Sequence, residues 1–168
     1  MASEPSIVTR TAQPYVSIAG TVTMATMGDI IARLPEVFGW LAGQGIPPAG
    51  PPFFRYNVID MARALEMEVG VPVADVLAAP PPFITGAVPE GRYVTTVHTG
   101  HPDELISATA DLLAWADEQG LTWDMTETPA GEQWTSRLEW YLTDPAEEPD
   151  MTKWQTELAF RLADLSGG

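Results

Sequence analysis

One acidic residue stands inside an apolar, aromatic stretch in the second half of the chain. The segment LEWYLTDP, residues 138–145, places Glu139 between Leu138 and Trp140 and ends at an Asp-Pro pair. This alternation of side chains predicts a β-strand, in which successive residues point to opposite faces of a sheet. A glutamate inside such a strand faces either water or a cavity. In a cavity, its carboxylate can bind a cation or take up a proton.

Counting by twos along residues 134–142 separates the two faces of this predicted strand. One face carries Trp134, Ser136, Leu138, Trp140 and Leu142, and the other carries Thr135, Arg137, Glu139 and Tyr141. We expect the first face to pack against a helix, so that Glu139 and Tyr141 point into a groove. The alternative is a solvated face on which Arg137 pairs with Glu139, an exposed contact that contributes only about 0–1 kcal/mol.

The composition excludes several classes of function. Eight Lys and Arg residues against 23 Asp and Glu residues give a net charge of −15, which opposes direct binding to nucleic acid or to an anionic membrane. Cysteine is absent and only two histidines are present, so we expect no metal site, and no sequence motif indicates a cofactor. The first residues lack the charged and apolar regions of a secretory leader, and we expect a cytoplasmic protein.

The elements that position Glu139 belong to an internal duplication. Three pairs of segments match in the same order: residues 7–20 with 85–100, 39–46 with 114–121, and 65–70 with 138–143. The first pair aligns Tyr15 with Tyr93, and the last aligns Glu66 with Glu139. Because the spacing between the halves changes only by loop-sized amounts, the sequence predicts two copies of one structural unit.

Each copy has the pattern ββαββ. Alternating segments predict hairpins over 6–10 with 15–24 and over 84–88 with 92–99, each followed by a helix, over 27–43 and 103–119. Closing hairpins follow, over 53–59 with 64–73 and over 134–142 with 156–164. Pro35 lies inside the first helical pattern and should kink that helix or mark its true start.

These elements predict an α+β fold with pseudo-two-fold symmetry, in which antiparallel sheets enclose a central ligand groove. We expect one domain over residues 1–168, with the pseudo-repeats at about 5–75 and 82–165. The segment 76–83 contains three consecutive prolines and should form an extended connection between the halves.

The duplicated unit, together with GRYVTTVHTGHPDEL (91–105), AWADEQGL (114–121), LEWYLTDP and KWQTEL (153–158), resembles the GyrI-like small-molecule-binding domains. Members of this family serve as effector-binding modules of multidrug regulators, as stand-alone proteins that include a gyrase inhibitor, and as hydrolases of cyclopropanoid DNA-alkylating compounds. About 13 residues precede the strand containing Tyr15, and we expect a stand-alone member because a helix-turn-helix needs more room.

The resemblance also implies a binding site. In the drug-binding members a glutamate on a strand of the second half lies in an aromatic groove, and Glu139 matches this residue, with Tyr141 matching a frequent tyrosine. Aromatic rings beside a desolvated carboxylate suit organic cations, because cation–π contacts add roughly 0.5–2 kcal/mol each. The complete predicted ligand-binding set is Glu139, Tyr141, Tyr56, Phe53, Trp123, Trp134 and Met67.

Three functions remain open at this point. The first is binding of amphipathic aromatic, often cationic, small molecules for sequestration or sensing. The second is hydrolysis of electrophilic cyclopropanoid natural products, with Glu139 as general base and Tyr141 orienting the leaving oxygen. The third is inhibition of a protein partner such as gyrase, with an acidic surface that mimics nucleic acid.

Overall fold

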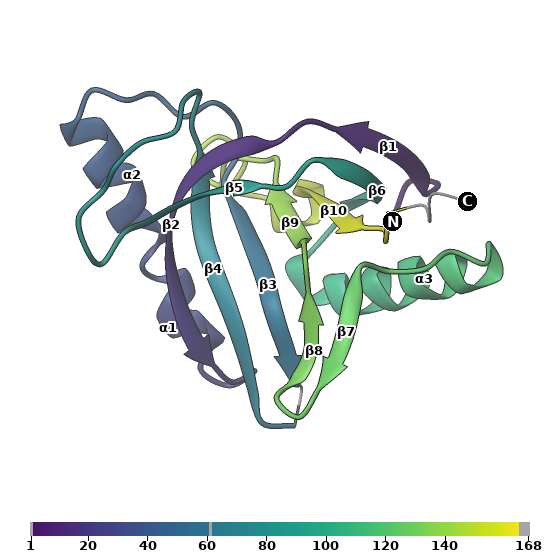
Figure 1. The fold of residues 1–168 in the computed structure, drawn as a ribbon. Coiled ribbons are helices and arrows are strands. Elements are labelled where there is room, and N and C mark those ends of the chain that lie inside the picture. The colour runs from purple at the N-terminus through teal and green to yellow at the C-terminus, as the bar shows by residue number, and fades with distance from the viewer. Residues whose placement is uncertain (1, 61, 165–168) are drawn as a thin grey trace.

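The computed structural model describes residues 2–60 and 62–164, which form a curled antiparallel sheet with helices against one face (Figure 1). The strands are β1 (Ser6–Arg10), β2 (Gln13–Val22), β3 (Phe53–Asp60), β4 (Ala64–Pro72), β5 (Ile84–Val88), β6 (Gly91–Thr99), β7 (Met125–Thr128), β8 (Gly131–Trp134), β9 (Arg137–Tyr141) and β10 (Gln155–Arg161). The helices are α1 (Met27–Ile31), α2 (Leu34–Gly43) and α3 (Leu105–Glu118), with short 3-10 turns at Pro102–Glu104 and Met151–Lys153. The predicted α+β fold class is confirmed.

The order of the strands shows the duplication directly. Within the described residues the path across the sheet is β1-β6-β10-β9-β3-β4-β2-β5. This order reads the same in reverse when β1 is exchanged with β5, β2 with β6, β3 with β9 and β4 with β10. The two halves therefore meet at the β3–β9 pair, which joins them into one continuous sheet instead of the two separate sheets expected from the sequence.

The opening hairpins predicted for each half were wrong. β1 pairs with β6 of the other half, and β2 pairs with β4 and with β5 of the other half. A two-residue hairpin turn requires positive φ angles, and within the described chain only glycines have them, none of which lies between Arg10 and Gln13. The chain consequently runs on from β1 into β2 across the top of the molecule (Figure 1).

The first helical pattern is divided into α1 and α2, because Pro35 lies in the first turn of α2, which begins at Leu34, and cannot donate a backbone hydrogen bond within a continuous helix. Of the two predicted outcomes, a kink or a helix start at Pro35, the structure shows the start, one residue earlier at Leu34. Both long helices end as expected, because Gly45 and Gly120 follow them with φ angles of 70° and 69°. Glycine adopts this left-handed conformation without the steric cost of a Cβ atom.

Two apolar clusters lie on opposite faces of the sheet. The larger cluster joins the helices to the sheet through residues such as Val37, Leu112 and Leu158. The smaller cluster contains Tyr15, Phe53, Val88, Tyr93, Leu138, Trp140 and Ala159, with Val8 packed against it. Val8 belongs to β1 and Val88 to β5. These two strands, each paired with a strand of the other half, therefore cover the face that the helices leave open.

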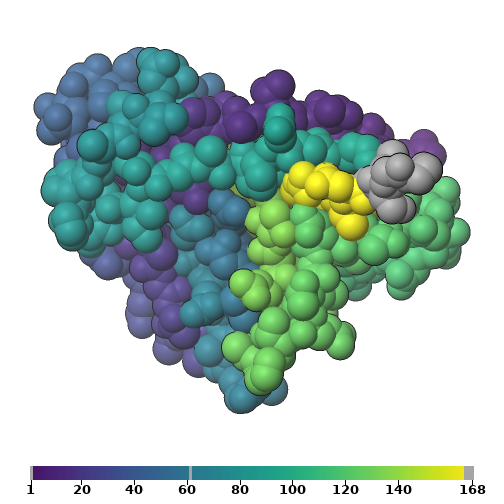
Figure 2. Space-filling view, in the orientation of Figure 1, coloured from purple at the N-terminus to yellow at the C-terminus, as the bar shows by residue number. Residues whose placement is uncertain are grey.

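A hairpin formed by β7 and β8 was not predicted. β8 pairs with the end of β3, and the turn between β7 and β8 lies against the turn between β3 and β4. Arg63 donates there to the Pro129 carbonyl at 2.8 Å. Both turns project together from the lower end of the molecule in the space-filling view (Figure 2).

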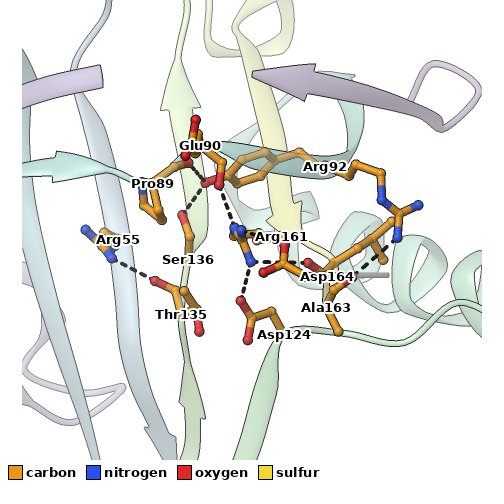
Figure 3. Close-up of polar contacts among 12 residues, drawn as sticks. Arg55, Pro89, Glu90, Arg92, Asp124, Thr135, Ser136, Arg161, Ala163 and Asp164 are labelled. Atoms are coloured by element: carbon orange, nitrogen blue, oxygen red, sulfur yellow. Dashed lines mark hydrogen bonds and ion pairs between the residues drawn. The ribbon is translucent and has the colours of Figure 1, made fainter. Parts of the chain in front are cut away.

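The Arg161 guanidinium fastens the end of β10 to three other segments (Figure 3). It donates to the Glu90 carbonyl at 2.9 Å, to the Asp124 carboxylate at 2.5 Å and to the Asp164 carboxylate at 3.0 Å. The side chain is 10% exposed, so these partners replace the water that an arginine normally binds. No helix within the described residues is long and apolar enough to cross a membrane.

Candidate functional site

A cavity of about 1220 Å³ opens on the helix-bearing face of the sheet. Strands β3, β4 and β9 contribute part of its wall, α1 and α2 another part, and the start of α3 a third. The apolar lining includes Met24, Met27, Ile31, Leu34, Phe38, Phe54, Ile59, Leu65, Leu105, Ile106 and Trp154. Its charged residues are Asp103, Arg137, Glu139 and Asp144. A cavity of this size and composition suits an apolar molecule with a few polar groups.

Glu139 lies in the wall of this cavity and is 9% exposed. The Tyr141 hydroxyl donates to its Oε1 at 2.6 Å, and the Tyr56 hydroxyl donates to the same oxygen at 2.9 Å. Tyr56 and Tyr141 also line the cavity. The structure therefore brings together three of the seven residues predicted from the sequence.

Burial raises the pKa of the Glu139 carboxyl above its ordinary value, while hydrogen bonds from Tyr141 and Tyr56 and the charge of Arg137 act in the opposite direction. Burial and the Glu139 carboxylate raise the pKa of both tyrosines well above the usual value for a phenol. Both hydroxyls thus keep their protons near neutral pH and remain donors. The arrangement can hold a cation or exchange a proton, since the carboxylate has lost most of its water.

The pseudo-two-fold axis of the sheet passes through this site. Phe54 on β3 lies directly opposite Glu139 on β9, and the registers of the flanking strands place these two residues at equivalent positions of the two halves. Two residues further along each strand are Tyr56 and Tyr141. The symmetry therefore supplies a tyrosine from each half, whereas only the second half supplies a carboxylate.

A β-bulge at Asn57 shapes the first-half side of the cavity. The register between β3 and β4 shifts between Tyr56 and Val58, which leaves Asn57 unpaired. As a result Tyr56 and Ile59, three residues apart, both line the cavity, although regular alternation would place them on opposite faces. The Asn57 side chain instead donates to Glu68 at 2.9 Å.

Arg137 is the one basic residue in the cavity lining formed by the described chain. Its guanidinium carbon lies 4.5 Å from the centre of the Phe160 ring and 4.9 Å from that of Trp134, distances typical of cation–π contacts. Nearby, the rings of Phe54 and Tyr141 are in contact, with their centres 4.4 Å apart. Glu139 is thus flanked by aromatic and cationic groups on the same face of the sheet.

The expectation that the Leu138 and Trp140 face packs against a helix was wrong. Leu138 and Trp140 belong to the smaller cluster beneath β1 and β5, and the helices lie on the Glu139 face. The alternation was also counted across a break, since β8 ends at Trp134 and β9 begins at Arg137. Trp134 therefore contacts Phe160 in the larger cluster instead of sharing a face with Leu138.

Four of the residues predicted to bind ligand lie outside the cavity lining. Phe53 is fully buried in the smaller cluster, where its ring contacts Tyr15 and Trp140, because it alternates with Phe54 along β3. Met67 is buried in the larger cluster. Trp123 and Trp134 pack on each other and on Phe160, and Trp134 also contacts Arg137, which lines the cavity.

The match that paired Glu66 with Glu139 was wrong as well. Residues 65–70 lie in β4, whose counterpart across the pseudo-two-fold axis is β10, whereas Glu139 lies in β9. Glu66 is exposed and is not part of the cavity lining. A short alternating motif recurs easily in any strand, so it identified the wrong partner.

Sequence reasoning missed Phe54, Arg137 as a cavity residue, and the helical contributions. A match of β3 with β9 that aligned Tyr56 with Tyr141 would have identified Phe54, because it lies two residues before Tyr56 as Glu139 lies two residues before Tyr141. The helical residues Met27, Phe38 and Ile106 carried no such signal, because their periodicity shows only that one side of the helix is apolar. Within the described residues no group of histidine, aspartate and glutamate side chains has the geometry of a metal site.

Comparison with solved structures finds the same fold. The transcription regulator EcmrR, in its complex with DNA, superimposes with a TM-score of 0.77 at 18% identity over 96% of this chain, which spans 58% of the regulator. SAV2435, whose structure contains tetraphenylphosphonium, gives a TM-score of 0.65 at 11% identity, covering 96% of this chain and 94% of that one. A hydrolase from Listeria innocua gives 0.62 at 14% identity, covering 95% and 92%.

At these identities the structural likeness establishes the fold alone. No curated protein sequence matches the chain. The model of one family does match, over residues 3–163, which include all the strands and helices of the described residues and the lining of the Glu139 cavity. The chain therefore belongs to the family of GyrI-like small molecule binding domains.

Proposed function

We propose that this protein binds amphipathic aromatic cations in the Glu139 cavity and serves to sequester or sense them in the cytoplasm. The observation that carries the proposal is a buried carboxylate in the wall of a large, mostly apolar cavity. A bound organic cation restores the electrostatic stabilisation that the carboxylate lost when it was removed from water. The surrounding rings of Phe54, Tyr56 and Tyr141 add apolar contact and cation–π attraction.

Two further facts support this proposal. The net charge of −15 attracts cations at long range and opposes direct contact with nucleic acid. SAV2435, which shares the fold, binds tetraphenylphosphonium in its solved structure. This compound is a lipophilic cation whose phosphorus atom carries four phenyl rings. Tetraphenylphosphonium is accordingly the first probe to test with this protein.

The test is an isothermal calorimetric titration of the wild type and of Glu139→Gln with tetraphenylphosphonium. The glutamine keeps the shape of the side chain and still accepts hydrogen bonds from the two tyrosines, but it removes the charge. We expect affinity to fall by about 1–2 kcal/mol, roughly tenfold. Equal affinity of the two proteins for the cation would reject the proposal.

Glu68→Gln is the matched control. Glu68 is also a buried carboxylate, 7% exposed, and accepts hydrogen bonds from Tyr15 at 2.9 Å and Ser17 at 2.7 Å, but it does not line the cavity. This substitution changes the net charge by the same amount as Glu139→Gln. Tetraphenylphosphonium affinity should remain within about twofold of the wild type, because long-range charge effects are largely screened at physiological salt.

Hydrolysis of an electrophilic cyclopropanoid compound is the second candidate. It is favoured by the raised pKa of Glu139, which makes the carboxylate a better base, and by the two phenol donors beside it. In this reaction Glu139 removes a proton from water, the oxygen attacks the cyclopropane carbon, and the broken C–C bond places its electrons on a conjugated carbonyl. Tyr141 or Tyr56 protonates that carbonyl oxygen and regains a proton from Glu139 through the hydrogen bond between them. The Listeria innocua hydrolase shares the fold.

Product analysis separates the two functions. If the protein is a hydrolase, Glu139→Gln will retain binding of an electrophilic cyclopropanoid substrate and lose its turnover, because the missing property is proton abstraction. If the protein only binds ligands, the wild type will release the compound unchanged. Single-turnover incubation with mass-spectrometric detection of the water adduct distinguishes these outcomes.

A further inference from the structure

Arg137 has no hydrogen-bond acceptor among the described residues, although it lines the ligand cavity. Its contacts are the faces of Trp134 and Phe160, and no ion pair joins it to Glu139. A guanidinium has five N–H donors, all in the plane of the group. The Trp134 and Phe160 rings contact the guanidinium without accepting a hydrogen bond that the structure shows, so its N–H donors are left to meet a ligand in the cavity.

The two charged side chains lie on the same face of β9. Arg137 and Glu139 are two residues apart, so their backbone positions are separated by about 7 Å. Glu139 already accepts two hydrogen bonds, whereas the Arg137 guanidinium donates none to the described residues. Burial lowers the pKa of the Arg137 guanidinium, while the charges of Glu139 and Glu132 raise it. The arginine is therefore a partly desolvated cation whose side chain has aromatic contacts but no hydrogen-bond acceptor among the described residues.

We infer that the ligand is amphoteric: it carries an anionic oxygen, such as a carboxylate, that binds Arg137, and a cationic or hydrogen-bond-donating part that faces Glu139. This inference rests on the proposed function, because it concerns the same cavity and specifies its ligand further. Arginine binds carboxylates through two parallel hydrogen bonds, which fixes orientation as well as strength. The cavity thus selects molecules whose opposite charges have the spacing of Arg137 and Glu139.

A matched pair of probes tests this inference. (4-Carboxyphenyl)triphenylphosphonium carries both charges, and its methyl ester keeps the phosphonium and the rings but lacks the carboxylate. We expect the wild type to bind the carboxylate about tenfold more tightly than the ester, since a charge-assisted pair is stronger than a neutral contact. Tighter binding of the ester, or equal binding of the two, would overturn the inference.

Arg137→Gln should abolish the preference for the carboxylate, measured as the ratio of the two affinities within the same variant. Arg137→Lys keeps the charge without the planar fork and should keep part of the preference. Arg63→Gln removes an equal charge from an exposed arginine that is not part of the cavity lining, and the preference should be unchanged. A preference that survives in Arg137→Gln shows that the carboxylate binds elsewhere and rejects the assignment.

The outcomes also separate this inference from the proposed function. If the ester binds and depends on Glu139 but the carboxylate gains nothing, the cation site stands and the Arg137 inference fails. If neither phosphonium binds while the anion 9-anthracenecarboxylate binds and requires Arg137, the proposed cation function fails and the anion contact stands. If none of the three probes binds, both the proposed cation function and the Arg137 inference are rejected.

Discussion

Tyr56 and Tyr141 occupy equivalent positions in the two halves of the fold and donate hydrogen bonds to one oxygen of Glu139, at 2.9 and 2.6 Å. The pseudo-two-fold axis runs between Glu139 and its counterpart Phe54. A symmetric scaffold thus supports an asymmetric site, because one carboxylate receives a donor from each half. Two carboxylates at the axis would repel each other and raise the pKa of one of them.

The two tyrosines should contribute cooperatively to stability. Tyr56→Phe and Tyr141→Phe each remove one donor from a buried carboxylate, and we expect each to lower the free energy of unfolding by about 1–2 kcal/mol. The double variant should lose more than the sum of the single variants, because it leaves Oε1 without a protein donor. Urea unfolding of the four proteins measures this coupling, and strict additivity would contradict it.

Cation binding should depend on the protonation of Glu139. Burial raises the pKa of this carboxyl above its ordinary value of 4.5, so a protonated form persists in the folded protein above the pH at which the unfolded chain loses that proton. Affinity for tetraphenylphosphonium should therefore rise with pH through the folded pKa and then level off. The same titration of Glu139→Gln should be flat over this range, and parallel curves would contradict the assignment.

Stability should change with pH in the opposite direction. Between the unfolded and the folded pKa of Glu139 the native state holds more protons than the unfolded state, so the free energy of unfolding falls as pH rises. Its contribution is fully present below the unfolded pKa and is lost as pH passes the folded pKa. Over this pH window the wild type should lose stability relative to Glu139→Gln, whose free energy of unfolding does not depend on this proton. Urea unfolding of both proteins at several pH values measures the difference.

Substitutions of the neighbouring residues Phe53 and Phe54 test which face of β3 meets the ligand. Phe54→Leu removes a ring from the cavity wall and its contact with Tyr141, and we expect tetraphenylphosphonium affinity to fall about threefold to tenfold. Phe53→Leu alters the smaller cluster and should lower stability by about 1–2 kcal/mol with affinity unchanged. The reverse pattern in calorimetry and urea unfolding would show that Phe53 is the ligand-facing residue.

Arg161 should be important for stability and not for ligand binding. Arg161→Met leaves the Asp124 carboxylate and the Glu90 carbonyl without their donor, and we expect a loss of about 2–3 kcal/mol. Arg63→Met is the control, because its ion pair with Asp60 involves an exposed side chain and should contribute less than about 1 kcal/mol. Comparable losses in the two variants would contradict the structural role of Arg161.

Much of the fold is encoded in local patterns that the sequence displays. Alternation and helical periodicity predicted most of the strands and the helices, since each pattern reports which side chains avoid water. Pro35 predicted the start of α2 because proline restricts its own backbone whatever surrounds it. Glu139 was identified as a charged residue in an apolar strand, and the family resemblance supported both Glu139 and Tyr141 as site residues.

The partners of each strand were decided only by the tertiary structure. Alternation defines two faces but does not state which strand pairs with β1 or which face the helices cover, because those choices depend on contacts between residues distant in sequence. This is why the hairpin of β1 with β2 and the helix over Leu138 were wrong, and why Phe53 was chosen in place of Phe54. The bulge at Asn57 reverses the alternation within β3, and the break before Arg137 separates Trp134 from β9. The sequence by itself determined the residue types of the site, whereas their assembly around Glu139 required both halves to fold together.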